Sequence, residues 1–210
     1  MGLKIITPPT VSPIEVIGLD AIKSHLQEAL DVSDNDSAIS ALTAAAWDLA
    51  ERQTWRQFLT ASYRLTLETF RAQAPDRNGN LCPVLIPRAP TQSIESVKYK
   101  DATDGTLTTL TVDDDYIIDD ESAICSIRPA YDTNWPGVRW NDPQAVQIEF
   151  TAGYGDTLED MPPVLIHAIK LQVGDWWRYR ESTVLSTPSV LSNSAKALLE
   201  SIEIRDDRLS

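Results

Sequence analysis

Hydrophobic residues recur at three- and four-residue steps near the start of the chain. The spacing predicts an amphipathic helix over residues 19–30, and its apolar positions are Leu19, Ile22, Leu26 and Leu30. An acidic loop follows, in which Ser33 and Asp36 have the spacing of a helix capping box. The apolar face then resumes over residues 37–54. We therefore predict two antiparallel helices joined by a short acidic loop, preceded by an extended proline-rich arm.

From about residue 58 the hydrophobic period changes from near 3.6 to 2. Residues 61–70, "ASYRLTLETF", alternate apolar and polar side chains, as a half-buried strand does. Asp104-Gly105 lies between two alternating runs as a hairpin turn, and three further runs, "DDDYIIDD", "SAICSIRP" and "AVQIEFTAG", follow. Closely spaced strands with turn residues between them predict an antiparallel sheet or sandwich of roughly five to seven strands.

A helical period returns at the proline pair Pro162-Pro163, which suits a first helical turn. The predicted helix runs to about residue 181. Its apolar stripe consists of Leu165, Ala168, Ile169, Gln172, Val173 and Trp176. Asn193 or Ser194 can then cap a short helix over residues 195–202.

Together these patterns predict an α+β fold. Its helical bundle core would combine the two N-terminal helices with the long C-terminal helix, and an antiparallel β-sheet or sandwich would be inserted between them. The corresponding division is residues 1–57 for the arm and helical pair, 58–160 for the β-rich insertion, and 161–210 for the long helix and the segments that complete the helical core.

Composition narrows the class of protein. The 210 residues are 42% hydrophobic and 23% charged, which is typical of a soluble globular chain, and no run of about 18 apolar residues indicates a membrane span. The net charge of −13 repels phosphate backbones and argues against sequence-specific nucleic-acid binding. Without an export signal, free thiols are favoured for Cys82 and Cys125, although the sequence leaves a disulfide open.

The segment 151–163, "TAGYGDTLEDMPP", is the place where a phosphate or metal loop would lie. It has no lysine, no third glycine and no EF-hand ligand pattern, so we expect a strand-to-helix connector. The two histidines, His25 and His167, lie on predicted helices apart from any serine or histidine motif. The sequence thus predicts no catalytic residue, no cofactor and no metal.

Two residue clusters leave other functions open. The acidic pairs around "YII", at 113–115 and 119–120, could serve a small acid–base hydrolase, although solvated hairpin ends are favoured. Two tryptophans, Trp135 and Trp140, could form an exposed platform in a carbohydrate- or ligand-binding β-module. Four tryptophans could instead lie between subunits. They are Trp135, Trp140, Trp176 and Trp177.

The order of the segments carries a resemblance. "ISALTAAAWDLAERQTWRQF", "YRLTLETF", "IRPAYDTNWP", "AVQIEFTAGYGD" and "MPPVLIHAIKLQVGDWWRYRES" follow one another as in the head–tail connector proteins of tailed bacteriophages, prophages and gene-transfer particles. These proteins are also called adaptor or head completion proteins. The chain resembles this family over residues 13–205. The roughly hundred-residue β-rich insertion marks a longer subtype than the family's short, essentially helical members.

The resemblance implies a structural virion protein and no enzyme. Such proteins form a ring, typically dodecameric, beneath the portal protein, and the ring links the DNA-filled head to the tail and lets DNA pass. Other expected partners are a tail-side stopper or tail terminator protein and further copies of the chain, which can stay monomeric until a portal supplies a template. The expected location is the head–tail interface of a virion assembled in the cytoplasm of a bacterial host.

By analogy with this family, the C-terminal segment is the candidate portal-docking site. Its proposed contact residues are Leu198, Leu199, Ile202 and Arg205. The alternative, that the three apolar side chains pack back on the chain's own helices, is left open. The four tryptophans named above are the candidate aromatic contacts between subunits.

Overall fold

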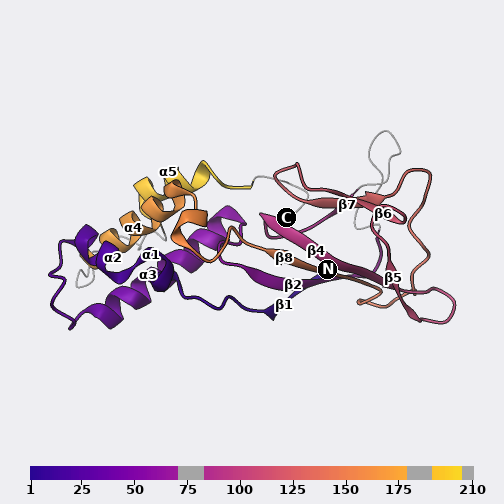
Figure 1. Cartoon of the computed structure of the whole chain (residues 1–210), viewed down its shortest axis with the longest axis horizontal. Helices are drawn as coiled ribbons and strands as arrows, with labels where there is room; N and C mark the ends of the chain where they lie inside the picture. Colours follow the sequence, from indigo (N-terminus) through magenta and orange to yellow (C-terminus); the bar gives the residue numbers. More distant parts are fainter. Residues whose placement is uncertain (71–82, 179–190, 205–210) are drawn as a thin grey trace. The chain divides into compact units, whose positions relative to one another are not determined.

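The computed structural model describes residues 1–70, 83–178 and 191–204. The chain divides into two compact units. The sheet unit comprises Met1–Pro8 and the described residues of Leu59–Tyr154. The helical unit comprises Pro9–Phe58 and the described residues of Gly155–Arg205. Each unit has its own core, and Figure 1 labels its helices and strands.

The sheet unit contains two antiparallel sheets (Figure 1). The larger has the strand order β1-β2-β8-β4-β5, with β1 Gly2–Thr7, β2 Ala61–Leu67, β8 Val146–Ala152, β4 Thr91–Lys100 and β5 Leu107–Leu110. The smaller has the order β3-β7-β6, with β3 Val84–Leu85, β7 Ser126–Pro129 and β6 Tyr116–Asp119. The predicted antiparallel sheets are confirmed.

Strict alternation of side chains builds the core of this unit. Along β2 and β8 every second residue is buried, because successive side chains point to opposite faces of a sheet. The register places Tyr63 opposite Phe150 and Leu65 opposite Ile148. The rings of Tyr63 and Phe150 stack with centroids 5.5 Å apart. Side chains of the smaller sheet, among them Ile127, join the same cluster, so one apolar core serves both sheets.

The N-terminal arm differs from the prediction. Residues 2–7 form β1, which pairs antiparallel with β2, so the arm lies with the sheet and not with the helices. Its pattern does not alternate cleanly, because Leu3, Ile5 and Ile6 are all apolar and a register shift lies between Ile5 and Thr7. The strand forms because β2 offers unpaired backbone groups, which the local sequence cannot reveal.

The helical unit contains five α-helices and one 3₁₀-helix among its described residues. They are α1 Pro13–Ile17, α2 Leu19–Leu26, α3 Asp36–Thr54, η1 Leu158–Asp160, α4 Pro163–Arg178 and α5 Asn193–Glu200. Helix α4 packs against both α3 and α5. Alanines at 46 and 50 of α3 and at 168 of α4 are buried, and small side chains of this kind allow close approach between helices. The α+β class is thus confirmed.

The predicted first helix is wrong in its extent. Gly18, at φ 84°, separates α1 from α2, and Gln27 adopts a left-handed conformation (φ 60°) that ends α2 after Leu26. Leu30 therefore lies outside the helix and is exposed. The periodic spacing continued past the point at which the backbone turned.

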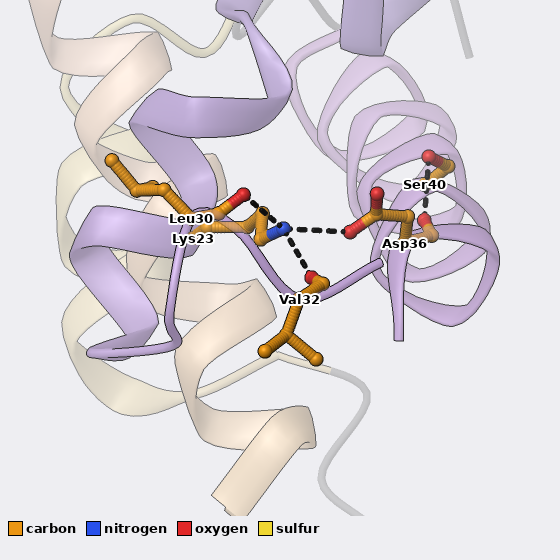
Figure 2. Close-up of polar contacts among 5 residues, drawn as sticks. All are labelled: Lys23, Leu30, Val32, Asp36 and Ser40. Carbon is orange, nitrogen blue, oxygen red and sulfur yellow. Dashed lines mark hydrogen bonds and ion pairs between the residues drawn. The ribbon is translucent and has the colours of Figure 1, made fainter. Parts of the chain in front are cut away.

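The predicted capping box at Ser33 is also wrong, because α3 begins after the N-cap residue Asn35. The Asp36 carboxylate pairs instead with Lys23, whose Nζ lies 3.0 Å from Oδ1 of Asp36 (Figure 2). The same ammonium donates to the carbonyl oxygens of Leu30 at 3.1 Å and Val32 at 2.6 Å. Lys23 is buried and thus holds the loop between α2 and α3 in place.

The C-terminal helices follow their predictions with shifted ends. Helix α4 begins at Pro163, and the part of its predicted range beyond residue 178 lies outside the described residues. Five residues of its predicted stripe are buried, whereas Trp176 is half-buried. The cap of α5 is Ser192 and not Asn193 or Ser194, since its hydroxyl accepts a hydrogen bond from the Ala195 amide at 3.3 Å.

Candidate interaction surfaces

The predicted portal-docking residues differ in exposure. Leu199 is 1% exposed and belongs to the core of the helical unit, whereas Leu198 and Ile202 are half-buried; Arg205 lies outside the described residues. The end of α5 is fixed to the end of α3: Arg56 donates to the Ile202 carbonyl at 2.6 Å, and the Ile204 amide donates to the Thr54 carbonyl at 3.1 Å. Leu198 and Ile202 are therefore the members of the set that retain contact surface.

The aromatic candidates in the sheet unit separate into one core residue and one surface residue. The Trp135 ring stacks on Phe70 with centroids 4.3 Å apart and an interplanar angle of 4°, and it packs against the core cluster. Trp140 is 91% exposed. Tyr131, which the sequence analysis did not single out, is as exposed as Trp140. The two tryptophans of this segment thus do not form a common platform for a sugar.

On α4, Trp176 and Trp177 are both half-buried. The indole N–H of Trp177 donates to Oε1 of Glu28 at 3.0 Å, which ties α4 to the residues that follow α2. A tryptophan uses its polar atom in this way where most of its ring is packed. The indoles of α4 thus contribute to packing within the helical unit and keep part of their surface exposed.

The solvent-facing side of the larger sheet carries paired charges. Arg64 Nε donates to Oε1 of Glu149 at 2.9 Å, and this hydrogen bond, together with the positive charge of Arg64, lowers the pKa of Glu149 against the effect of burial. Lys100 Nζ lies 2.8 Å from Oδ2 of Asp142, and the hydrogen bond lowers the pKa of that carboxyl. These pairs join strands and a loop that are far apart in the sequence.

The two outer strands of this sheet are exposed edges. All six residues of β1 are exposed, including Leu3 and Ile5, and three of the four residues of β5 are exposed. Sequence analysis missed this surface because it did not predict β1. Each edge combines unpaired backbone groups with exposed apolar side chains, Leu3 and Ile5 on β1 and Leu107 on β5.

The segment 151–163 is a connector built around specific conformations. Gly153 has φ 135°, and a Cβ there would lie 2.6 Å from the carbonyl oxygen of Leu59. Asp160 accepts hydrogen bonds from the Thr157 hydroxyl at 2.8 Å and the Thr157 amide at 3.0 Å, and both bonds lower the pKa of its carboxyl. Asp160 thus caps η1, and the segment is the predicted strand-to-helix connector, with the boundary between the two units after Tyr154.

The residues considered for catalysis make structural contacts. His25 on α2 lies beside Lys170 and His167 on α4; burial first, and then the charge of Lys170, lower the pKa of His25. The Asp115 carboxylate accepts from the Thr111 amide at 2.7 Å, and Asp119 lies 3.6 Å from Arg128. These arrangements hold turns and helices, and they align no base with a nucleophile.

The described residues also offer little in the way of a deep pocket, a metal-ligand cluster or a reactive thiol. A shallow depression of about 320 Å³ is lined by Leu158, Met161, Pro163, Ile166, His167 and Lys170. The described residues contain no group of three or more potential metal ligands. Cys125 is buried with a free thiol, and burial, followed by the charge of Asp120, raises its pKa to about 11; Cys82 lies outside the described residues. None of the helices described is long and apolar enough to cross a membrane.

Comparison with solved structures gives matches over nearly the whole chain. A chain in the neck of an empty gene transfer agent (GTA) particle, with C6 symmetry, is 21% identical and has a TM-score of 0.71. A chain in the virion of a native gene transfer agent particle is also 21% identical, with a TM-score of 0.70. A chain in the neck of a native GTA particle, with C12 symmetry, is 20% identical, with a TM-score of 0.66.

Each of these three matches covers 98% of this chain and 97% of the other. No family model matches the sequence, and no curated protein matches it. The comparisons therefore establish a shared fold, which spans both the sheet unit and the helical unit.

Proposed function

We propose that this protein is a structural subunit of a virion neck, a head–tail connector that forms a ring beneath a portal protein and lets DNA pass. The observation that carries the proposal is the match in fold over 98% of the chain to chains from gene transfer agent necks and a virion. A match of this coverage includes both units, so it applies to the architecture of the whole chain and not to one common domain.

The charge of the chain supports the passage of DNA. With 31 acidic against 18 basic residues, the net charge of −13 repels phosphate groups. A channel wall that bound phosphates would retard the DNA, because each neutralised phosphate adds to the affinity through counterion release. A negative surface instead leaves DNA free to slide. The same repulsion disfavours sequence-specific binding of nucleic acid.

A ring is the assembly that best fits the neighbours' symmetry. The similar neck structures have C6 and C12 symmetry. In a ring each copy offers two different surfaces to its neighbours, and closure is reached when the rotation between copies completes a circle. We therefore propose rings of this kind here, with the portal on one side and a stopper or tail terminator protein on the other.

The competing functions lack support from the described residues. A carbohydrate module would need neighbouring exposed indoles, yet Trp135 is stacked on Phe70 in the core cluster. An acid–base hydrolase would need two facing carboxylates, whereas Asp115 and Asp119 are engaged with Thr111 and Arg128. We propose that the protein is not an enzyme and needs no cofactor or metal.

The test is co-sedimentation of the full chain with purified portal rings of the same particle. The docking variant is Leu198→Asn combined with Ile202→Asn, which changes the two half-buried residues and leaves Leu199 in its core. The control is Ala197→Asn, an exposed position on the same helix. We expect wild type and control to sediment with portals and the docking variant to stay in the supernatant, although its thermal unfolding shows that it is folded.

Two results would each contradict one part of the proposal, the connector function or the docking through α5. If the wild-type chain fails to bind portals, the connector function is lost. If the wild-type chain and the docking variant bind equally, the function stands and α5 is not the docking site.

A further inference from the structure

The edge strand β1 extends the apolar face of the larger sheet beyond the covered core. Leu3 pairs with Leu65 and Ile5 with Tyr63, and residues directly opposite each other in a sheet point to the same face. Leu65 and Tyr63 are buried in the core cluster, whereas Leu3 is 38% and Ile5 50% exposed. An apolar edge of this kind is prone to pair with a further strand.

The opposite edge of the same sheet is β5 (Figure 1). The same face continues onto it, because Leu110 pairs with the buried Val97, and Thr108 pairs with Tyr99. Leu107, on the other face, is 48% exposed. The sheet thus presents two free strands, and the core face reaches both.

The two edges carry opposite charge. Lys4 is the one charged residue of β1, which has no acid. β5 itself has no charged residue, but the segments that flank it, within residues 101–115, contain five acids and no lysine or arginine. Asp104 precedes β5, and the exposed run 113–115 follows it. Lys4 forms no ion pair within the described residues, so its charge is available to a partner.

We propose that neighbouring copies of this chain join edge to edge, with β5 of one copy beside β1 of the next. This inference rests on the proposed ring and specifies the surface through which the ring closes. Its occupant is a second copy because one chain carries both halves of the contact: a basic apolar edge and an acidic edge. Such a head-to-tail contact repeats around a ring, whereas a contact between two identical edges ends at a dimer.

Strand directions are compatible with this contact. Successive pairs β1·β2, β2·β8, β8·β4 and β4·β5 are all antiparallel, so β1 and β5 run in the same direction. Copies related by the small rotation of a many-membered ring keep this direction, and β5 therefore adds to β1 as a parallel strand. Parallel pairing is slightly weaker per residue. Because β5 has only four residues, the contact is short and suits assembly on a portal template.

The first experiment compares two aspartate substitutions on portal-bound protein. Ile5→Asp places a charge in the proposed contact, and Ile117→Asp is the matched control, since Ile117 is a 43% exposed isoleucine on β6 of the smaller sheet. We expect the control to bind each portal ring in the same number of copies as wild type does. Ile5→Asp should be retained roughly tenfold more weakly, because the charge would be desolvated at the centre of the contact.

The second experiment tests the pairing itself by oxidative cross-linking in a Cys82→Ser background. A chain with both Ile5→Cys and Thr108→Cys should yield a ladder of covalent dimers, trimers and longer products on portals. Chains with either cysteine alone should remain monomeric on denaturing gels. Dimers from Ile5→Cys alone would indicate contact between identical edges and overturn the proposal.

The outcomes separate the two proposals. Suppose that wild type binds portals, that as many copies of Ile5→Asp bind per portal ring, and that the double cysteine chain gives no ladder. The connector function then stands and the edge contact is wrong. If wild type does not bind portals, the connector proposal itself fails.

Discussion

Lys23 illustrates how a single side chain can fix a loop. Its buried ammonium lies within 3.1 Å of the Leu30 and Val32 carbonyls and the Asp36 carboxylate (Figure 2). A buried amine is tolerated when it is paired and its hydrogens are all bonded. The three partners satisfy its three donors, and they come from the loop and from the start of α3.

We predict that Lys23→Met destabilises the helical unit by about 2–3 kcal/mol, because it leaves Asp36 and two carbonyl groups without their cation. The estimate lies below that for a fully buried pair, since the Asp36 side chain is 30% exposed. The measurement is urea unfolding. The control is Lys196→Met, which removes an exposed pair with Glu200 and should cost less than about 0.5 kcal/mol. Equal effects of the two changes would show that the Lys23 contacts do not stabilise the loop.

Gly153 is the second residue whose identity the fold requires. With φ 135° and the Leu59 and Thr60 backbone in the way, Gly153→Ala should destabilise the sheet unit by about 2–4 kcal/mol. The matched control is Gly137→Ala, where an added Cβ would lie 3.5 Å from the Ala102 side chain and the change should stay within about 0.5 kcal/mol. Thermal unfolding of the two variants measures the difference, and a neutral Gly153→Ala would mean that the connector adopts another backbone conformation.

Among the elements, α2 packs against α4 so that His25 is partly buried beside a lysine. His25 lies beside Lys170 and His167, and a Cβ on Gly174 of α4 would lie 3.3 Å from Nε2 of His25. Burial first, and then the charge of Lys170, lower the pKa of His25, while a hydrogen bond with the Lys170 backbone opposes them. The neutral imidazole is therefore the form that this helix contact favours.

This lowered pKa predicts a pH dependence with a definite sign. The unfolded chain binds a proton at His25 near pH 6.5, before the folded chain does, so the stability from His25 is present above that pH and falls as the pH drops through the lowered pKa. His25→Gln should flatten the loss of stability that wild type shows as the pH falls below about 6.5. Urea unfolding at several pH values measures it, and an unchanged slope would contradict the assignment.

Further acidification should destabilise wild type and His25→Gln alike. Hydrogen bonds from Ser12 lower the pKa of Glu15, and those from Thr157 lower that of Asp160. The stability from these carboxylates is present above their ordinary pKa, about 4, and is lost as the pH falls through the lowered values. The histidine effect begins near pH 6.5, above the ordinary pKa of these carboxyls, and the difference between wild type and His25→Gln isolates it.

At the scale of the whole molecule, the two units have separate cores, and α5 belongs to only one of them. Its Ala195 and Leu199 are buried, as is Ile204 after it. A chain that ends at Leu191 should lose amide protection throughout the helical unit, because removing even one such core side chain costs about 2–5 kcal/mol. Protection in β2, β4 and β8 should persist. Hydrogen exchange with mass spectrometry measures both, and retained helical protection would show that α5 adds no stability.

The contribution of α5 to the core also determines which variants can test docking. Because α5 contributes to the core, truncation would change folding and binding together, and substitutions at Leu198 and Ile202 are the more informative variants. Their side chains keep part of their surface exposed while Leu199 holds the helix in place.

Local periodicity was sufficient to predict the elements whose own side chains decide their conformation. The alternation in β2 and β8 and the apolar stripe of α4 correspond to the residues that are buried, whereas the buried face of α3 combines Ile39 and Ala46 with residues outside the predicted stripe, among them Trp47 and Ala50. The ends of elements were less predictable. Gln27 adopts a left-handed conformation and Asn35 precedes α3, and both features depend on the loop that Lys23 holds.

The surfaces proposed for function could be predicted only in part. The sequence placed Leu198, Leu199 and Ile202 on one short helix, but only packing against α3 and α4 shows that Leu199 faces inward. It also grouped Trp135 with Trp140, because both lie in one polar segment. The stacking of Trp135 on Phe70 depends on a contact between distant parts of the chain, for which neighbouring residues give no signal.

The sequence by itself determined the α+β class, the order of helices and sheet, the strong negative charge and the resemblance to connector proteins, because these depend on composition and on local periods. Only the folded chain shows that β1 is an edge strand, that Lys23 is buried among carbonyl groups, and that β1 and β5 lie at opposite edges of one sheet. The physical reason is that strand pairing and charge burial depend on backbone groups and side chains that only folding brings together.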